Sequence, residues 1–354
     1  MKGLILSGGK GTRLRPITHT SAKQLVPVAN KPVLFYGIEA IVGAGIDDIG
    51  IIVGDTENEI RAAVGDGSKF GCKVTYIRQD QPLGLAHAVL TAEEYIGEST
   101  FVMYLGDNLI MGGISELVAD FKAKQPNSQI LLHKVPNPSQ FGVAQLDHGR
   151  VVRLDEKPAD PQSDLALVGV YMFDKTVFKA ARAIKPSARG ELEITDAIQW
   201  LVDQGYEVIS HEVTGWWKDT GKLEDMLEAN RMVLDTFKTR IEGEVCAQSS
   251  VEFKVVIEPG AKVVNSTIRG PAIIGRNAVI ENSFIGPFTA IYYDTVVRNC
   301  EIEHSIVLEC SQVLDIDVQI TDSLIGQNVK VQKLNLKPKA YRFMLGDSSL
   351  VGIL

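Results

Sequence analysis

A cluster of small and basic residues follows an apolar run at the start of the chain, in LILSGGKGTRLRPIT, residues 4–18. Its glycines allow backbone N–H groups to approach an anion closely, as they do in other anion-binding loops. Arg13 adds a forked donor that suits phosphate, and Lys23 adds a second cation. The stretch matches neither GxxxxGK[ST] nor GxGxxG. We favour a phosphate-binding loop of another kind over a turn with no ligand.

Two aspartates follow short apolar runs and could hold a metal ion. LGDN places Asp107 just after a predicted strand, and WWKDTG supplies Asp219. Two carboxylates that each give one oxygen to a hydrated Mg²⁺ would suit a nucleoside triphosphate. A lone aspartate after a strand is often a helix cap, so neither residue carries this prediction by itself.

Further charged candidates stand in LDEKP, with Glu156 and Lys157, and in ARGELEITD, with Arg189 and Glu191. The six histidines show no HExxH spacing, and no GxSxG motif is present. Covalent nucleophilic catalysis therefore has little support.

Residues 1 to about 240 alternate strand-like and helix-like patterns. This alternation predicts an α/β fold with a mostly parallel sheet that helices cover on both faces. Such sheets bind ligands at the carboxyl ends of their strands, where SGGKGTRLR and LGDN both fall. Strands are expected at 2–9, which runs into a glycine turn, and at 47–54, 73–80 and 100–108, and helices at 31–45, 83–96 and 222–234.

The sequence after about residue 250 repeats with a period of seventeen, which indicates a solenoid. The apolar positions within one period are six, six and five residues apart, too close for helical repeats. The pattern predicts a three-sided β-helix with stacked asparagines at one corner, and an irregular β-sandwich is the weaker alternative. The aliphatic registers are Ile257, Ile274, Ile291, Leu308 and Ile325; Val263, Ile280, Val297, Leu314 and Val331; and Val251, Ile268, Ile285 and Ile302.

Length and composition limit the remaining choices. A chain of 354 residues suggests two domains, which we expect at 1–240 and 241–354. A net charge of −8 argues against nucleic-acid binding, and no apolar run approaches the roughly 20 residues that span a bilayer. The four cysteines lack CxxC spacing and are expected to be buried thiols. A strand that begins at Lys2 leaves no room for a signal peptide, so we expect a cytoplasmic protein.

Together these motifs resemble a known family. GGKGTRLRPIT with KQLVPVANKPV, and then LGDN, DEKP, GVYMFD, RGELEITD and WWKDTG, are similar in type and order to the motifs of the sugar-1-phosphate nucleotidylyltransferases. The chain most closely resembles the long form of the glucose-1-phosphate thymidylyltransferases. The resemblance implies a Rossmann-like nucleotidyltransferase domain followed by a C-terminal left-handed parallel β-helix of the hexapeptide type.

The resemblance also implies a reaction. An oxygen of α-D-glucose 1-phosphate attacks the α-phosphorus of dTTP, pyrophosphate leaves, and Mg²⁺ assists without a covalent enzyme intermediate. This reaction, which forms dTDP-glucose, would be the first step of dTDP-deoxysugar synthesis. The protein is expected to form a homo-oligomer.

Residue roles follow from the resemblance, position by position. The catalytic cations would be Arg13, Lys23, Lys157 and Arg189. The Mg²⁺ ligands would be Asp107 and Asp219. The nucleotide would lie against Leu6, Gly8, Gly9, Gly11, Thr12, Gln79, Gly84 and Asp107. The sugar pocket would contain Gly142, Glu156, Val168, Tyr171, Glu191 and Trp217.

The chain departs from the family pattern in the loop that would bind the base. RQDQPLGLAHA keeps the length of the usual loop but has His87 where glutamine is usual. Gln79 could pair through its amide with the N3–H and O4 edge of thymine or uracil. The contact at residue 87 is open. Lys218 also replaces an apolar residue between Trp217 and Asp219.

Three alternatives remain open at this point. A uridylyltransferase or another sugar-1-phosphate nucleotidylyltransferase would use the same chemistry, because a single methyl group gives only about 1–3 kcal/mol of discrimination. An acyltransferase site in the β-helix has little support, since His304 is the one histidine of the repeats and no long loop interrupts them. A non-catalytic relative would be expected to lack some of the cations and aspartates, which are all present.

Overall fold

In the computed structural model, residues 1–9, 11–15, 17–19 and 22–333 are described. The chain forms two compact units that are interleaved in sequence. The first unit comprises Met1–Lys10, Ser21–Leu25 and Val33–Asp219, and the second comprises Gly11–Thr20, Val26–Pro32 and Thr220–Leu354. The contiguous division at residue 240 stays a prediction.

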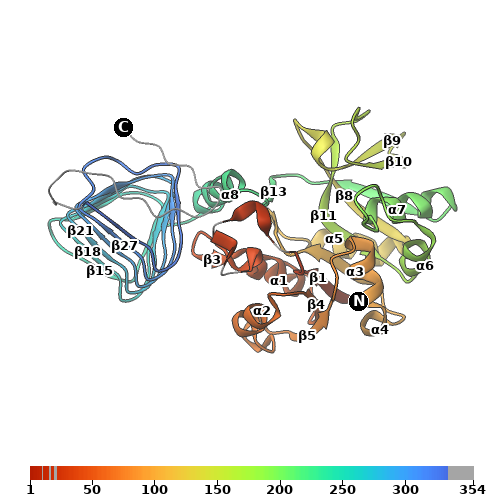
Figure 1. Ribbon diagram of the computed structural model, residues 1–354, viewed down its shortest axis with the longest axis horizontal. Coiled ribbons are helices and arrows are strands. Elements are labelled where there is room, and N and C mark those ends of the chain that lie inside the picture. Colours follow the sequence, from red (N-terminus) through yellow and green to blue (C-terminus); the bar gives the residue numbers. More distant parts are fainter. Residues whose placement is uncertain (10, 16, 20–21, 334–354) are drawn as a thin grey trace. The chain divides into compact units, whose positions relative to one another are not determined.

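A nine-stranded mixed sheet forms the centre of the first unit (Figure 1). Its parallel part has the order β6-β1-β4-β5, as expected for this region, and β11 continues it with antiparallel pairs to β6, β8 and β9. The strands are β1 (Lys2–Leu6), β4 (Asp48–Val53), β5 (Lys73–Arg78), β6 (Phe101–Leu105), β8 (Ser128–Lys134), β9 (Gly142–Asp147), β10 (Arg150–Glu156), β11 (Leu165–Phe173) and β12 (Val208–Glu212).

Helices cover both faces of this sheet because its buried strands direct apolar side chains to both sides. In β1, Leu4 and Leu6 pack on one face, whereas Ile5 packs on the other. The Ile5 face is covered by α1 (Val33–Gly43), α2 (Glu57–Val64) and α5 (Ser115–Lys124). The Leu4 face is covered by α3 (Leu85–Thr91), α4 (Glu93–Ile96), α6 (Thr176–Ala183) and α7 (Ile194–Asp203). The single helix expected over 83–96 is thus divided in two at Ala92.

Two small elements of the first unit matter for the site. A two-stranded antiparallel ribbon pairs β7 (Asn108–Ile110) with β13 (Trp217–Asp219), and its register sets Asp219 opposite Asn108. A short 3-10 helix, η3, covers Lys23–Leu25. The ribbon brings the predicted metal ligand Asp219 next to LGDN although more than a hundred residues separate them in sequence.

The second unit contains a three-sided parallel β-helix, whose stacked coils are visible in Figure 1. The arrangement is consistent with the predicted left-handed β-helix. Its first sheet consists of β14 (Arg240–Ile241), β17 (Val255–Ile257), β20 (Ala272–Ile274), β23 (Thr289–Ile291), β26 (Ile306–Val307) and β28 (Leu324–Ile325). The second consists of β15 (Glu244–Val245), β18 (Lys262–Val264), β21 (Val279–Glu281), β24 (Val296–Arg298), β27 (Gln312–Leu314) and β29 (Lys330–Gln332). The third consists of β16 (Ser250–Val251), β19 (Thr267–Ile268), β22 (Phe284–Ile285) and β25 (Glu301–Ile302).

The period of seventeen holds through the early coils and then fails. Ile257, Ile274 and Ile291 pair in register as predicted, but Ile291 pairs next with Val307 instead of Leu308. Likewise Val313, and not Leu314, pairs with Val297. The corner before β26 is one residue shorter than the corresponding corner one coil earlier, and the corner after β27 is two residues longer. The two predicted inward positions are therefore wrong, and the register is restored by Ile325 and Val331.

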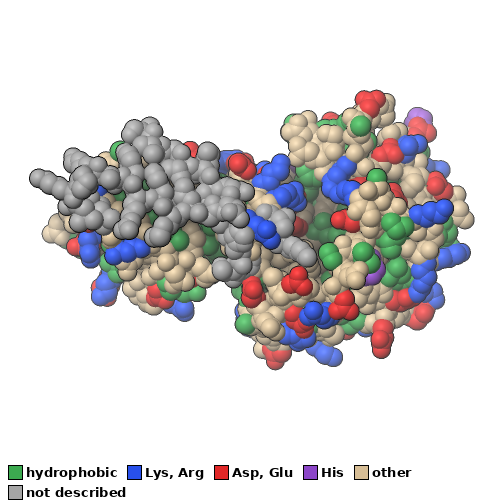
Figure 2. Space-filling view, in the orientation of Figure 1, with side chains coloured by type: hydrophobic (Ala, Val, Ile, Leu, Met, Phe, Trp, Pro, Cys, Tyr) green, Lys and Arg blue, Asp and Glu red, His purple; other side chains and the backbone are tan. Residues whose placement is uncertain are grey.

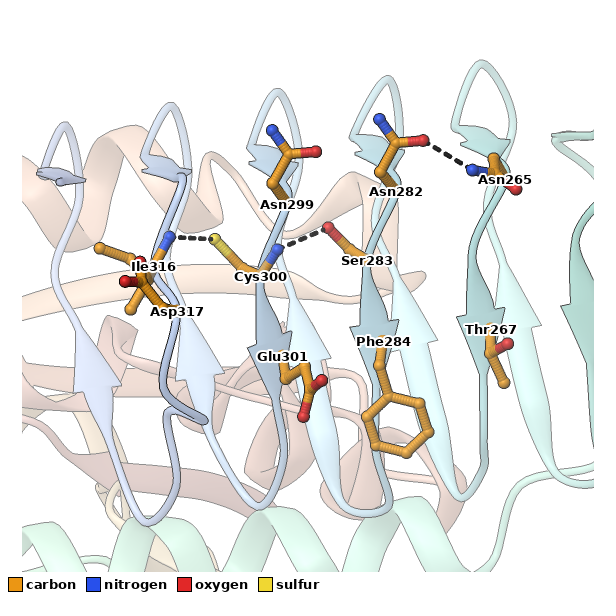
Figure 3. A pocket seen from close by; sticks show the side chains of 10 residues that line it. All are labelled: Asn265, Thr267, Asn282, Ser283, Phe284, Asn299, Cys300, Glu301, Ile316 and Asp317. Atoms are coloured by element: carbon orange, nitrogen blue, oxygen red, sulfur yellow. Dashed lines mark hydrogen bonds between the residues drawn. The ribbon is translucent and has the colours of Figure 1, made fainter.

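The predicted asparagine corner is present. Asn265, Asn282 and Asn299 all have positive φ, a conformation that asparagine tolerates better than most residues. Asn265 Nδ2 donates to Asn282 Oδ1 over 2.8 Å, and Asn299 Nδ2 donates to Asp315 Oδ1 over 2.6 Å. Figure 3 shows Asn265, Asn282 and Asn299 in a row, and these three residues help to line a groove of about 500 Å³.

The rest of the second unit packs on the first sheet of the β-helix. The outward side chains of that sheet, such as Val256 and Ile273, are buried. α8 (Leu223–Asp235), which the sequence predicts, covers it, and Asn230 Nδ2 donates to Phe288 O over 2.9 Å. The remaining elements of this unit are η1 (Thr12–Leu14), η2 (Ile17–His19), β2 (Pro27–Val28) and β3 (Lys31–Pro32).

Surface features agree in part with the composition. Basic and acidic side chains are interspersed on the visible described surface, without one large basic patch (Figure 2). Among the described residues, no helix combines the length and apolar character required to cross a membrane. The four cysteines are free, but the expectation that all are buried is wrong: Cys310 is exposed, and Cys72 and Cys246 are half-buried.

Candidate active site

A cavity of about 240 Å³ opens at the carboxyl ends of the parallel strands of the first unit. β1 leads into it through Gly8 and Gly9, β5 through Gln79, and β6 through Asp107. This is the edge at which open α/β sheets bind ligands. The lining includes seven residues assigned above to the nucleotide or the sugar: Leu6, Gly8, Gly9, Gln79, Gly84, Asp107 and Glu191.

The glycine wall of the cavity leaves little space for side chains. A Cβ at Gly8 would lie 3.3 Å from Oε1 of Gln79, a tight contact. At Gly84, φ is 106°, and a Cβ would lie 2.6 Å from the backbone nitrogen of Leu192. Gly84 therefore permits both the turn and the close approach of the two loops. A hydrogen bond from Leu192 N to Leu83 O over 2.7 Å joins the two loops.

A buried ammonium lies between the two predicted metal ligands. Lys23 in η3 is only 6% exposed, and its Nζ donates to Oδ2 of Asp107. The same Nζ lies 3.9 Å from Oδ1 of Asp219. Both carboxylates thus reach a single cation.

The β7–β13 ribbon fixes these carboxylates. Asn108 Nδ2 donates to Oδ1 of Asp107 over 2.9 Å, and the indole N–H of Trp217 donates to Oδ1 of Asn108 over 2.5 Å. Burial works to raise the pKa of the Asp107 carboxyl. The charge of Lys23 and the hydrogen bonds from Lys23 and Asn108 outweigh burial and hold that pKa below its ordinary value. Asp107 is therefore ionised at neutral pH.

The donor set suits a hard divalent cation that also binds substrate phosphates. The described residues contain no group of three or more His, Cys, Asp or Glu side chains that could hold a metal alone. Mg²⁺ is commonly held by one or two carboxylates plus phosphates and water, so Asp107 and Asp219 fit it.

A second polar cluster gathers around Glu156 at the end of β10. Arg189 Nη2 donates to Oε1 of Glu156 over 2.9 Å and to Oε1 of Glu193 over 2.8 Å. Thr195 Oγ1 donates to Oε2 of Glu156 over 2.7 Å. Burial works to lower the pKa of Arg189, but the surrounding glutamates outweigh it and the net shift is upward. The guanidinium and Glu156 thus form a charged pair that could meet a phosphate and sugar hydroxyls.

Gly142 and Lys157 complete this cluster. β9 and β10 pair Gly142 with Glu156, and a Cβ at Gly142 would lie 2.8 Å from Oγ1 of Thr195. Lys157 Nζ lies 3.8 Å from Oε1 of Glu156. Lys157 has φ of 45°, which is uncommon for a residue other than glycine and occurs often at functional sites.

The other residues that the resemblance assigns to the site belong to neither of these two clusters. Val168 has no exposed surface and packs with the apolar residues of the Ile5 face. Tyr171 is buried, and burial together with the charge of Glu156 raises the pKa of its hydroxyl. Gly11, Thr12 and Arg13 belong to the second unit, where the Arg13 side chain is exposed. Their assigned roles stay predictions.

Sequence reasoning missed three residues of the site. Gln24 lines the cavity, is 3% exposed, and its Oε1 accepts no hydrogen bond from the described residues. Its position beside Lys23 in KQLVPV was a usable signal. Asn108, the last letter of LGDN, was equally visible. Thr195 lies within RGELEITD, but its contact with Glu156, 39 residues away, gave no signal in the sequence.

Comparison with known proteins places this geometry in a family. The family model described as nucleotidyl transferase matches residues 2–236, so the chain belongs to the nucleotidyl transferase family. Within it, the chain is similar over almost its full length to proteins named for one activity. It is 55% identical over 350 residues to the glucose-1-phosphate thymidylyltransferase of Streptomyces griseus, covering 99% of this chain and 98% of that protein. It is 57% identical over 355 residues to that of Streptomyces antibioticus, covering 100% and 99%.

A solved structure matches about two thirds of the chain. The crystal structure of a putative glucose-1-phosphate thymidylyltransferase from Bacillus anthracis, in complex with a sucrose, has a TM-score of 0.64 and 36% sequence identity. The match covers 68% of this chain but 98% of the other. About a third of this chain thus lies outside the match, as expected for a long form.

Proposed function

We propose that this protein transfers a thymidylyl group from dTTP to α-D-glucose 1-phosphate, giving dTDP-glucose and pyrophosphate. The observation that carries the proposal is the buried Lys23 ammonium, which two aspartates flank, one of them in the lining of the strand-end cavity. The named activity of full-length relatives supports the choice of substrates.

The cavity offers binding groups and lacks the usual nucleophiles. Among the described residues that line it there is no serine, cysteine or histidine. Direct attack of the sugar phosphate on the α-phosphorus therefore fits better than a covalent intermediate. Catalysis would consist of positioning and charge neutralisation, as in other phosphoryl transfers.

Each substrate would meet a separate polar cluster. The nucleotide would lie along Gly8 and Gly9 with its base toward Gln79 and Gly84. The sugar hydroxyls would donate to Glu156 and Glu191, and Lys157 and Arg189 would neutralise the attacking phosphate. Arg13 remains the predicted donor to the leaving pyrophosphate.

Mg²⁺ would be held by Asp107 and Asp219, and when bound it would supply charge neutralisation for the triphosphate. Lys23 holds a positive charge between the same carboxylates and orients them. Gln24, with an unused amide oxygen in the cavity, would accept a hydrogen bond from the nucleoside. A homo-oligomeric, cytoplasmic enzyme completes the proposal.

Pyrophosphate release across a panel of nucleotides and sugars tests this proposal. dTTP, UTP, dCTP, ATP and GTP would each be paired with glucose, galactose and mannose 1-phosphates, with Mg²⁺ and with EDTA. We expect the highest kcat/KM for dTTP with glucose 1-phosphate and no turnover in EDTA. Preference for UTP would replace the proposal with a uridylyltransferase. Absence of release with every pair would refute nucleotidyl transfer.

A further inference from the structure

The side chain of Gln79, which follows β5, is held by the loop and helix that come after it. Its Nε2 lies 2.8 Å from Nδ1 of His87 in α3. The same Nε2 donates to the backbone oxygen of Gly84 over 3.5 Å. His87 is half-buried, and its backbone oxygen accepts a hydrogen bond from Thr91 Oγ1 over 2.9 Å. A histidine thus stands behind the amide that faces the cavity.

The orientation of this amide follows from what its partners can do. A backbone carbonyl only accepts hydrogen bonds, so the NH₂ group of Gln79 must face Gly84. The amide nitrogen has no lone pair to offer, so it also donates to His87, and Nδ1 of His87 must accept. The neutral imidazole then carries its proton on Nε2. Both hydrogens of the Gln79 amide are consequently used within the protein.

What remains for a ligand is the carbonyl oxygen of Gln79. This Oε1 lies against Gly8, since a Cβ on Gly8 would be 3.3 Å from it. Gly8, Gln79 and Gly84 all line the same cavity. The wall at this point is therefore an acceptor and offers no donor from this side chain. Thymine and uracil have a donor at N3, whereas cytosine has an acceptor there.

We propose that His87 is a positioning residue that sets base specificity. It accepts a hydrogen bond from Nε2 of Gln79 and thereby fixes the orientation of the amide. Oε1 of Gln79 then accepts a hydrogen bond from the N3–H of thymine or uracil, whereas it faces the N3 lone pair of cytosine and repels it. This inference rests on the proposed function in that the ligand is a pyrimidine nucleoside triphosphate. The sequence alone indicates that Gln79 could pair with both N3–H and O4 of the base. Here Gln79 would bind N3–H alone, and other groups would bind O4.

The test is the ratio of dissociation constants for dTTP and dCTP, measured by isothermal titration calorimetry on the full chain with Mg²⁺ and without sugar phosphate. In His87→Leu the acceptor is lost, and the amide can turn to donate to cytosine N3. We expect the preference for dTTP to fall at least tenfold, a loss of about 1.4 kcal/mol in discrimination. In His87→Asn, Oδ1 takes the place of Nδ1 as acceptor, and the preference should return to within about threefold of the wild type.

A matched control is His211→Leu. His211 lies in β12, is also half-buried, and is hydrogen-bonded to Asp120. It is not one of the residues that line the cavity. Its replacement should leave the ratio unchanged. An unchanged ratio in His87→Leu, or failure of His87→Asn to restore it, would overturn the inference, as would a wild type that binds dCTP as tightly as dTTP. Because binding is measured without turnover, a wild type that selects dTTP yet releases no pyrophosphate would refute the proposed function and leave this test valid.

Discussion

The cavity region and the β-helix use similar polar side chains in opposite ways. In the β-helix, polar groups stand one coil apart and satisfy one another: Arg298 Nε donates to Glu281 over 2.7 Å, and Asn277 donates to Asp294 over 3.0 Å. Around the cavity, side chains from distant segments converge. Lys23, Asp107 and Asp219 meet although α1 and most strands of the sheet separate them along the chain.

This difference shows how the two regions relate to function. A ladder of repeated pairs stabilises stacked coils and leaves little bonding capacity for a ligand. A convergent cluster concentrates charge, which costs stability unless each charge is compensated, and it is suited to binding charged substrates. Substitutions in the β-helix should therefore lower folding stability and leave turnover unchanged, whereas substitutions around the cavity should lower turnover whether or not they also change stability.

The largest effect is expected from Asp219→Asn. Loss of one carboxylate at the metal position should lower kcat by about 10³-fold or more, because charge stabilisation of this kind is worth several kcal/mol. Steady-state pyrophosphate release measures it, with circular dichroism to verify the fold. Asp120→Asn, which changes an aspartate bonded to Lys124 and His211, is the matched control and should retain kcat. Near-normal turnover of Asp219→Asn would remove Asp219 from the metal site.

A large effect on folding stability is expected from Ile280→Ala. Ile280 is fully buried among the inward aliphatic residues of the β-helix. The cavity left behind should lower the free energy of unfolding by about 2–5 kcal/mol, and Ile280→Val by about 0.5–1.5 kcal/mol. Urea denaturation measures this, and kcat at 25 °C should not change. A parallel loss of kcat in the folded variant would show that the two regions are not independent.

A smaller, pH-dependent effect is expected for Asp107. Its pKa is below the unfolded value near 4, so its ionised form stabilises the native state above that pH, and this contribution is lost as pH falls through the lower native pKa. Asp107→Asn should therefore lower the free energy of unfolding by about 1–3 kcal/mol at pH 7 and by progressively less below pH 4. Urea denaturation at several pH values tests the sign, and a pH-independent difference would contradict it.

The smallest effect is expected at the asparagine corner. Asn282→Ala removes the hydrogen bond from Asn265 and places alanine at φ of 48°, so it should cost about 1–2 kcal/mol. Asn282→Gly loses the hydrogen bond but tolerates positive φ, and should cost less. Thermal unfolding compares the two. If the glycine variant were less stable than the alanine variant, backbone conformation would not be the main cause of the stability loss in Asn282→Ala.

The sequence predicts local and repeated features of this molecule better than convergent ones. The strand ends at Gly8 and Asp107 follow from apolar runs and the glycines after them. The period of seventeen predicts the coils until IVL at 306–308, where three adjacent apolar residues make the inward position ambiguous. Corner lengths decide it in favour of Val307, and hydrophobic periodicity does not report corner lengths.

Contacts between distant segments could not be read from the chain. Thr195 meets Glu156, and Gln79 meets His87, because α7 packs on the sheet and α3 follows β5 through a tight loop. The motif that contains Gln24 was visible, but its burial against the cavity was not. The burial of Val168 in the apolar core was equally hidden from the sequence, and its assignment to the sugar pocket stays a prediction.

The central claim is that the triphosphate lies at the carboxyl ends of β1 and β6, with its metal on the two aspartates. A crystal structure with dTTP and Mg²⁺ tests this most directly. The account predicts phosphate oxygens against the glycines after β1, a metal bound to both Asp107 and Asp219, and the thymine N3 at Oε1 of Gln79. A triphosphate bound anywhere else, or a metal that contacts neither aspartate, would contradict it.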